Sequence, residues 1–287
     1  MSSTRIRRLL KPAAHHVSFA AGRLTWSMRM TPALLLAGAQ RCGTTSMYRA
    51  LAQHPAIAKP VLRKGIHFFD VAYTEDLKWY LSHFPLRATA RHAAPRGIDP
   101  ITFESSPYYL FHPLASSRIA ESLPGVKILV LVRDPVERAY SAHAHEQARG
   151  YEDETFERAL ELEEERLQGE EERLLSDPDY ESRAHRHQAY LRRGRYAEQL
   201  QRMSDCVGRD RVHVVDSQLF FTEPEKVFAS VLAFLDLPPV GTIQFERHNA
   251  RSRAPMTAAL RHRLESHFTP YDEQLISWLG ATPIWRR

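Results

Sequence analysis

The sequence is poor in cysteine and in long apolar runs. Only Cys42 and Cys206 occur among its 287 residues, which excludes a disulfide framework and favours a reducing compartment, so we expect a cytoplasmic location. No stretch approaches the roughly 18 apolar residues of a membrane span. No apolar core of signal-peptide length follows the basic residues at positions 5–11.

Acidic residues are also missing from the first quarter of the chain. No Asp or Glu precedes Asp70, whereas residues 152–172 are crowded with Glu. A basic first quarter suits an anionic ligand. We expect residues 1–30 to form a basic tail or lead-in, with a possible peripheral contact to anionic lipid. The Glu-rich segment predicts solvated helices that flank a binding cleft and disfavour a highly anionic molecule beside them.

Strand and helix signals alternate along the rest of the chain. Apolar, largely β-branched or aliphatic runs at 33–37, 126–132 and 211–216 predict strands. Helical patterns follow at 45–53, from Pro135, and at 227–235, the last after an apparent capping box at 222–225. This order predicts one α/β domain over residues 31–287, a mostly parallel sheet with helices on both faces.

Two further segments have a helical composition. Residues 151–193 predict a pair of polar surface helices broken near Asp177-Pro178, and residues 256–280 predict one or two helices that pack on the body.

The most informative motif lies between the first predicted strand and its helix. Gly38-Ala-Gln-Arg-Cys-Gly-Thr-Thr-Ser46 has two glycines for a close turn, three hydroxyls and a cation, Arg41. Backbone N–H groups at the start of a helix bind anions. The glycine spacing is that of a nucleoside-triphosphate loop, but Thr44 stands where such a loop needs Lys. The motif therefore predicts a P-loop-like phosphate site without the Walker lysine; a turn that needs its glycines only for packing is the alternative.

A second motif follows the strand at 126–132. Arg133 stands at the strand end and Ser141 lies about two helical turns further on. An arginine fork and a hydroxyl can converge there on one phosphate, because ligands of open α/β sheets bind beyond the carboxyl ends of the strands. The alternative for Arg133 is a surface salt bridge with Glu137.

Together these motifs resemble those of the sulfotransferases that use 3′-phosphoadenosine 5′-phosphosulfate (PAPS), especially the heparan sulfate glucosaminyl type and its bacterial relatives. Further similar segments are His67-Phe-Phe-Asp70 and Glu104-Ser-Ser-Pro-Tyr-Tyr109. The resemblance implies the sulfotransferase fold, PAPS as donor, PAP as product, and a carbohydrate, glycolipid or hydroxylated metabolite as acceptor; it implies no nucleic-acid partner. The donor-binding residues it implies are Arg41, Cys42, Gly43, Thr44, Thr45, Ser46, Arg133, Ser141, Arg251, Ser252 and Arg253.

The chain departs from the family pattern at two positions. Arg41 replaces the loop lysine, and Gly65 replaces the glutamate that acts as general base in heparan-type relatives. Arginine keeps the charge but does not readily give up a proton, so the expected role of Arg41 is electrostatic. The base must be another residue. His67 is the first candidate because imidazole titrates near neutral pH, and Glu104 is the second.

Each candidate base has a structural alternative. His67 would otherwise orient Asp70 or pack against Phe68, and Glu104 would otherwise pair with Lys64 or an arginine. No metal-ligand spacing occurs among the fifteen histidines, so we expect no metal. Two other functions stay open: a PAP(S)-binding module without catalysis, favoured by Gly65, and a kinase, disfavoured by the missing Walker lysine.

Overall fold

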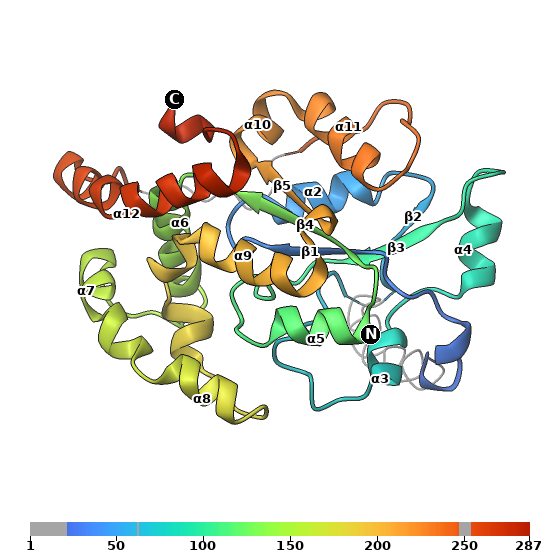
Figure 1. Ribbon diagram of the computed structural model, residues 1–287, viewed down its shortest axis with the longest axis horizontal. Helices are drawn as coiled ribbons and strands as arrows, with labels where there is room; N and C mark the ends of the chain where they lie inside the picture. The colour runs from blue at the N-terminus through green and yellow to red at the C-terminus, as the bar shows by residue number, and fades with distance from the viewer. Residues whose placement is uncertain (1–21, 62, 247–253) are drawn as a thin grey trace, which may run out of the picture.

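The computed structural model describes residues 22–61, 63–246 and 254–287. Over these residues the centre is a sheet of five parallel strands in the order β2-β3-β1-β4-β5 (Figure 1). The strands are β1 (Leu34–Gly38), β2 (Ile57–Ala58), β3 (Ile101–Glu104), β4 (Lys127–Val132) and β5 (Val212–Asp216). The predicted strands at 33–37, 126–132 and 211–216 are thus the three adjacent strands β1, β4 and β5.

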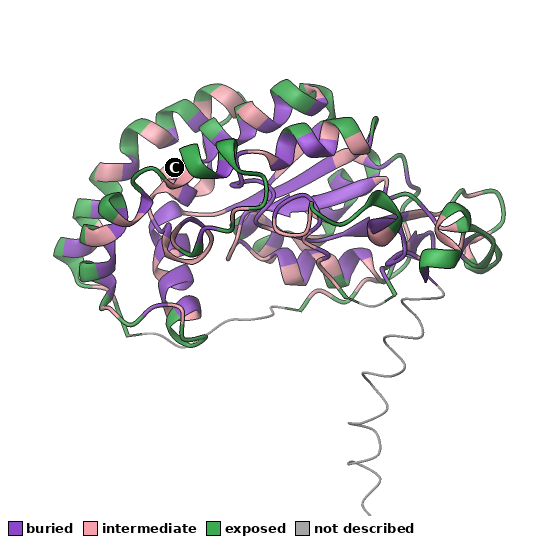
Figure 2. Cartoon of the chain, turned by 90° about the horizontal axis from the view of Figure 1, so that it is seen from below, coloured by how far each residue is buried: buried purple, intermediate pink, exposed green. Residues whose placement is uncertain are grey.

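Helices cover both faces of this sheet, as the alternation of strands and helices predicts. In Figure 1, α2 (Thr44–Leu51), α10 (Ser217–Thr222) and α11 (Pro224–Phe234) lie above the strands. Below them lie α5 (Ala115–Ser122) and α9 (Tyr196–Val207). Every residue of β1 is buried, and Figure 2 shows the strands as the buried centre of the molecule. Such burial on both faces explains the continuous apolar runs of the parallel strands.

A second core lies beside the sheet. Helix α6 (Pro135–Gln147) begins where the sequence predicts, because Asp134 accepts a hydrogen bond from the Val136 amide at 2.9 Å and Pro135 occupies the first turn. It packs with α7 (Phe156–Leu167) and α12 (Ala258–Leu279). The single helix α12 fulfils the expectation of one or two helices at 256–280.

One local prediction is wrong and another is incomplete. Thr222 does not cap α11: it ends α10, and its hydroxyl donates to the Gln218 carbonyl at 3.1 Å. The polar segment breaks at Asp177, where α8 (Glu170–Ser176) ends, as predicted, but it also breaks at Gly169, which takes the left-handed conformation between α7 and α8. The Glu-rich segment is also not wholly solvated, since Glu163 is buried and accepts hydrogen bonds from three backbone amides, those of 190–192.

The remaining elements are short. Helices α3 (Leu77–Leu81) and α4 (Arg87–Ala93) precede β3, and a π-helical turn spans Ala184–Gln188. Short 3-10 turns span Trp26–Met28, Arg192–Gly194, Arg209–Arg211 and Ile284–Arg286. The end of the expected lead-in packs on the body, with Arg23 bonded to Asp76 at 3.2 Å. None of the helices in the described ranges has the length and apolarity to cross a bilayer.

We predict that Phe268→Ala lowers the free energy of unfolding by about 3–5 kcal/mol, the usual effect of removing a buried aromatic ring. Phe268 is fully buried in the second core. Urea unfolding followed by circular dichroism measures the change. Leu175→Ala on α8 is the control: Leu175 is 53% exposed, so the change should stay within about 0.5 kcal/mol. Equal effects of the two substitutions would contradict the assignment of α12 to this core.

Candidate functional site

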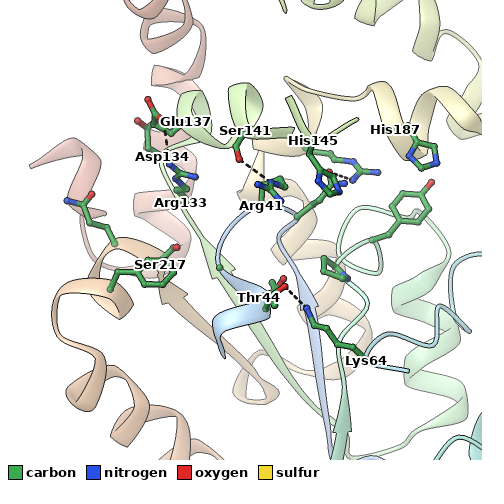
Figure 3. A pocket seen from close by; sticks show the side chains of 18 of the residues that line it. Arg41, Thr44, Lys64, Arg133, Asp134, Glu137, Ser141, His145, His187 and Ser217 are labelled. Carbon is green, nitrogen blue, oxygen red and sulfur yellow. Dashed lines mark hydrogen bonds and ion pairs between the residues drawn. The ribbon is translucent and has the colours of Figure 1, made fainter. Parts of the chain in front are cut away.

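A cavity of about 750 Å³ opens at the carboxyl end of the sheet. Its wall comes from the segments that follow β1, β4 and β5, which parallel pairing brings to one edge. Residues 64–67, 107–108 and 186–193 close the other side. Figure 3 shows the side chains of Arg41, Arg133 and Lys64 around this space.

The predicted phosphate loop forms one wall of the cavity. Gly43 has φ 86° and is the N-cap of α2, so the loop turns directly into the helix. The N-terminus of α2, the end of a helix that binds anions, therefore lies at the cavity. Arg41 also has a positive φ of 70°, an uncommon conformation for a residue with a side chain. Gly43, Thr44 and Thr45 line the cavity together with Arg41. The loop therefore presents a cation and two hydroxyls to the same space.

Two loop residues that the resemblance implied point elsewhere. Cys42 is fully buried, and its sulfur lies 3.7 Å from the Tyr196 hydroxyl, while its amide donates to the Ala39 carbonyl. Ser46 is likewise buried, and neither residue belongs to the cavity lining. Arg251, Ser252 and Arg253 lie outside the described residues.

The loop and the second motif meet, as the sequence predicts. Arg41 Nε donates a hydrogen bond to Ser141 Oγ on α6 at 3.1 Å (Figure 3). Arg133 lines the same cavity, and its guanidinium also forms the ion pair with Glu137 that the sequence offered as an alternative, at 3.4 Å. The two readings of Arg133 are therefore compatible, because the pair lies in the cavity wall itself.

Lys64 is a lining residue to which the sequence analysis gave no role of its own. Its ammonium donates to Thr45 Oγ1 at 3.1 Å, so it reaches the phosphate loop from a different segment. Burial lowers the pKa of Lys64 to about 8, against an opposing effect of the Glu104 charge. Its position three residues before the His67–Asp70 segment was the available signal.

His67 lies in the cavity wall with a fixed orientation. Its Nδ1 lies 2.8 Å from Asp70 Oδ2, and the Asp70 side chain is fully buried while that of His67 is 34% exposed. Burial alone would lower the pKa of His67, but the hydrogen bond and the charge of Asp70 outweigh it, so the pKa is raised above 6.5. Because Asp70 occupies Nδ1, Nε2 is the ring nitrogen that can exchange a proton with a bound molecule.

The structure does not bring Glu104 to the cavity. The residue has no exposed surface; its carboxylate accepts hydrogen bonds from Tyr109 Oη at 2.6 Å and from Ser106 Oγ at 2.7 Å. The Ile66 amide donates to it as well, at 3.3 Å. Burial raises the pKa of Glu104, although these bonds favour the ionised form. Glu104 therefore lies behind the cavity wall and supports the segment that carries His67.

The expectation that the Glu-rich segment flanks the cleft is wrong for the wall opposite the phosphate loop. None of the lining residues comes from 151–175. Arg149, Arg186 and His187 stand there instead. His187 Nδ1 lies 2.9 Å from Glu146 Oε2, and its ring stacks on Tyr151 with centroids 3.9 Å apart. The expectation fails because the glutamates of α7 and α8 do not reach the cavity: Glu163 accepts from backbone amides and Glu170 accepts from Tyr180 and Ser182.

A buried network ties the two walls together. Gln40 of the loop donates to Glu146 at 3.0 Å and accepts from Arg193 at 2.7 Å. Glu146 has no exposed surface and also holds His187. Burial opposes its charge, but His187 and Arg149 hold the pKa of Glu146 below its usual value. The ionised Glu146 therefore fixes the loop relative to the opposite wall.

The charges of the lining favour an anion. Two carboxylates, Asp134 and Glu137, face six Arg or Lys side chains. The six are Arg41, Lys64, Arg133, Arg149, Arg186 and Arg193. Low-dielectric walls with one prevailing sign of charge concentrate ligands of the opposite sign. Within the described residues no three His, Cys, Asp or Glu side chains gather in a metal-binding group.

Comparison with known proteins agrees with this geometry. A membrane-associated sulfotransferase of Dictyostelium discoideum (kil1) is 23% identical over 321 residues, which cover 89% of this chain and 66% of the relative. The human bifunctional heparan sulfate N-deacetylase/N-sulfotransferase 1 is 29% identical over 231 residues, 77% of this chain but 24% of the relative. The chain thus spans less than two thirds of either protein.

A solved structure and a family model complete the comparison. The crystal structure of a sulfotransferase from Alicyclobacillus acidocaldarius superposes with a TM-score of 0.68 and 28% identity, covering 90% of this chain and 99% of that one. The family model of the sulfotransferase domain matches residues 31–254. On this match, and with the expected α/β fold, the chain belongs to the sulfotransferase family.

Proposed function

We propose that this sulfotransferase takes a sulfuryl group from PAPS, transfers it to a hydroxyl or amine of an acceptor, and releases PAP. One observation carries the proposal: Arg41, Arg133 and Ser141, from the two motifs, line one cavity with the hydroxyls of Thr44 and Thr45. A donor with phosphates at both ends of its ribose needs two anion sites in one cavity. The strand ends of β1 and β4 supply them.

The residues present fit such a donor. The loop amides, Thr44 and Thr45 would hold the 5′-phosphosulfate, since helix N-termini bind phosphate groups. Arg133 and Ser141 would hold the 3′-phosphate, where an arginine fork gives a bidentate contact. Phe221 and Trp285 line the same cavity and offer aromatic surface to the adenine ring of the donor.

When bound, the donor supplies a sulfuryl group on a phosphate leaving group, so that transfer forms a bond from sulfur to the acceptor atom and breaks the bond from sulfur to the phosphate oxygen. Arg41 and Lys64 would stabilise the negative charge that develops on this oxygen. An arginine side chain keeps its charge near neutral pH. The ammonium of Lys64, with a pKa of about 8, is the group of the two that can also give up a proton near neutral pH.

His67 would take the proton of the acceptor. The hydrogen bond to Asp70 fixes the ring with Nδ1 towards the carboxylate, so Nε2 is the basic nitrogen. A carboxylate behind an imidazole orients it and stabilises its protonated form. Glu104 is a weaker candidate in this structure, since its oxygens lie behind the cavity wall and are already engaged by Tyr109 and Ser106.

For the acceptor we propose a carbohydrate, a glycolipid or a hydroxylated metabolite. Relatives named for a glycan acceptor, such as human heparan sulfate glucosamine 3-O-sulfotransferase 5, support the carbohydrate. A cytoplasmic location, and a peripheral lipid contact of the basic N-terminus, belong to the same proposal. They rest on the cysteine content and charge of the sequence.

A second function is favoured by one residue. Gly65 stands where heparan-type relatives carry their base, and a PAP-binding protein without transfer activity would need none. Thermal stabilisation by PAP without transfer from labelled PAPS to any acceptor in an extract of host metabolites would support that function. Stabilisation by ATP in preference to PAP would instead support a kinase.

We predict that PAP binds with a Kd in the low micromolar range or below. Arg133→Ala should raise this Kd by about 30- to 150-fold, because a charge-assisted bidentate contact is worth about 2–3 kcal/mol. Isothermal titration calorimetry measures both affinities. Arg91→Ala is the control, because Arg91 forms an exposed ion pair with Asp99 and is not in the cavity lining. An unchanged Kd for Arg133→Ala would remove the 3′-phosphate assignment.

We predict that His67→Ala lowers turnover by about 100- to 10,000-fold, the usual contribution of a general base, while the Kd of PAP stays the same. In the wild type the rate should fall as pH drops through the raised pKa of His67, since protonation removes the base. Initial rates with labelled PAPS between pH 5 and 9 give the profile. A wild-type profile in His67→Ala, together with an inactive but folded Glu104→Gln, would transfer the role to Glu104.

We predict that Asp70→Asn lowers the pKa of His67, because burial then acts without the opposing carboxylate. NMR titration of the imidazole ring carbons measures the pKa, and the acid limb of the pH–rate profile should move to lower pH with it. Asp99→Asn, which removes an exposed carboxylate outside the cavity, is the control. An unchanged His67 pKa in Asp70→Asn would show that the pair does not set the proton affinity of the ring.

A further inference from the structure

Glu137 lies between two guanidinium groups in the cavity wall. Its Oε2 is 3.4 Å from Arg133 Nη2, and its Oε1 accepts a hydrogen bond from Arg261 Nη2. Arg133 follows β4, Glu137 is in the first turn of α6, and Arg261 comes from α12. Figure 3 shows Glu137 and Asp134 grouped beside Arg133 at the edge of the cavity.

Asp134 belongs to the same group of charges. Its Oδ2 lies 3.9 Å from Arg261 Nη1, while its Oδ1 caps α6. The hydrogen bond and charge of Glu137, together with the charge of Asp134, raise the pKa of Arg261 against the effect of burial. Two carboxylates and two guanidinium groups thus form one cluster, of which Arg133, Asp134 and Glu137 line the cavity and Arg261 does not.

This arrangement opposes the binding of an anion. A carboxylate on Arg133 occupies the same donors that a phosphate would use, and it repels the incoming charge. Both effects depend on how much of the Glu137 charge is held elsewhere. Arg133 contacts Oε2 of Glu137 and Arg261 contacts Oε1, so these contacts use different carboxylate oxygens.

We propose that Arg261 is a positioning residue for the donor site: it holds Glu137 and thereby frees Arg133 for a phosphate. The proposal rests on the proposed function, in which Arg133 binds the 3′-phosphate of the donor. When a phosphate takes the guanidinium of Arg133, Glu137 keeps its contact with Arg261. Helix α12, distant in sequence from both motifs, therefore sets the affinity of the site for its ligand.

A double-mutant cycle on PAP binding tests this inference. Arg261→Ala should raise the Kd of PAP about three- to fivefold, the factor that a partly exposed ion pair is typically worth. Glu137→Gln should lower the Kd by a similar factor, because it removes the competing charge. In the Glu137→Gln background, Arg261→Ala should change the Kd little, since the charge that Arg261 controls is gone.

The matched control is Glu265→Gln. Glu265 is a further carboxylate near Arg261, at 3.9 Å on the same helix, and it lies outside the cavity lining. Its substitution leaves the hydrogen bond between Arg261 and Glu137 in place, so the Kd of PAP should stay at the wild-type value. The melting temperature of each protein, without ligand, separates loss of α12 packing from loss of binding.

Two outcomes would overturn the inference. If Arg261→Ala weakens PAP equally in both backgrounds, Arg261 acts through its own charge and not through Glu137. If Glu137→Gln weakens PAP or leaves it unchanged, Glu137 does not compete. Titration of the same proteins with inorganic pyrophosphate keeps the two proposals apart. Failure of the wild type to bind PAP refutes the proposed function. The order of the pyrophosphate affinities among the wild type and the variants still decides the role of Arg261.

Discussion

Parallel pairing of β1 with β4 is the constraint on which the site depends. Leu35 pairs with Ile128 and Leu36 with Leu129, and this register brings the ends of the two strands to one edge. Each strand is followed at once by a loop and a helix, so Arg41 and Arg133 cannot lie far apart. The hydrogen bond from Arg41 to Ser141 joins the first turn after β1 to the helix after β4. Burial of the two apolar strands thus determines where the cations lie.

Buried carboxylates outside the ligand space offset the repulsion between the cations that gather around the cavity. Glu146 lies behind Gln40 and His187, and Asp70 lies behind His67. Each is fully buried as a side chain, so it neutralises a neighbour without presenting its charge to a bound anion. Asp134 and Glu137 are the exceptions, since both line the cavity. Carboxylates there need a further cation, and Arg261 of α12 supplies it.

The sequence predicted the strongly patterned parts of this arrangement. The runs that became β1, β4 and β5, the Asp134-Pro135 start of α6 and the meeting of the two motifs follow from burial, capping and parallel topology. Strands β2 and β3 are two and four residues long, too short for a periodicity to show. The capping box at 222–225 was misplaced because a helix already occupied 217–222, and local sequence does not distinguish the last turn of one helix from the cap of the next.

Contacts between distant segments were beyond sequence reasoning. Lys64 reaches Thr45, and Arg261 reaches Glu137 across 124 positions; no spacing rule connects such residues. For the Glu-rich helices, the sequence predicted a contact with the cavity that the packing does not make. Their composition indicated an acidic wall, but which face of a helix meets a cavity depends on its packing, and Glu163 turned inwards to the amides of Tyr190 and Leu191.

Gly65, where the resemblance implies a glutamate in heparan-type relatives, lies in a closely packed segment. A side-chain carbon at position 65 would lie 2.4 Å from the carbonyl oxygen of Ser105, closer than atoms approach. The same closeness lets the Ser105 amide donate to the Lys64 carbonyl at 3.0 Å, and the His67 amide donate to Ser106 Oγ at 3.0 Å. The backbone contact that leaves no room for a carboxylate at 65 is therefore the contact that holds Lys64 and His67 at the cavity. In the function that we propose, the base therefore has to come from another residue, and we propose His67, which is hydrogen-bonded to Asp70.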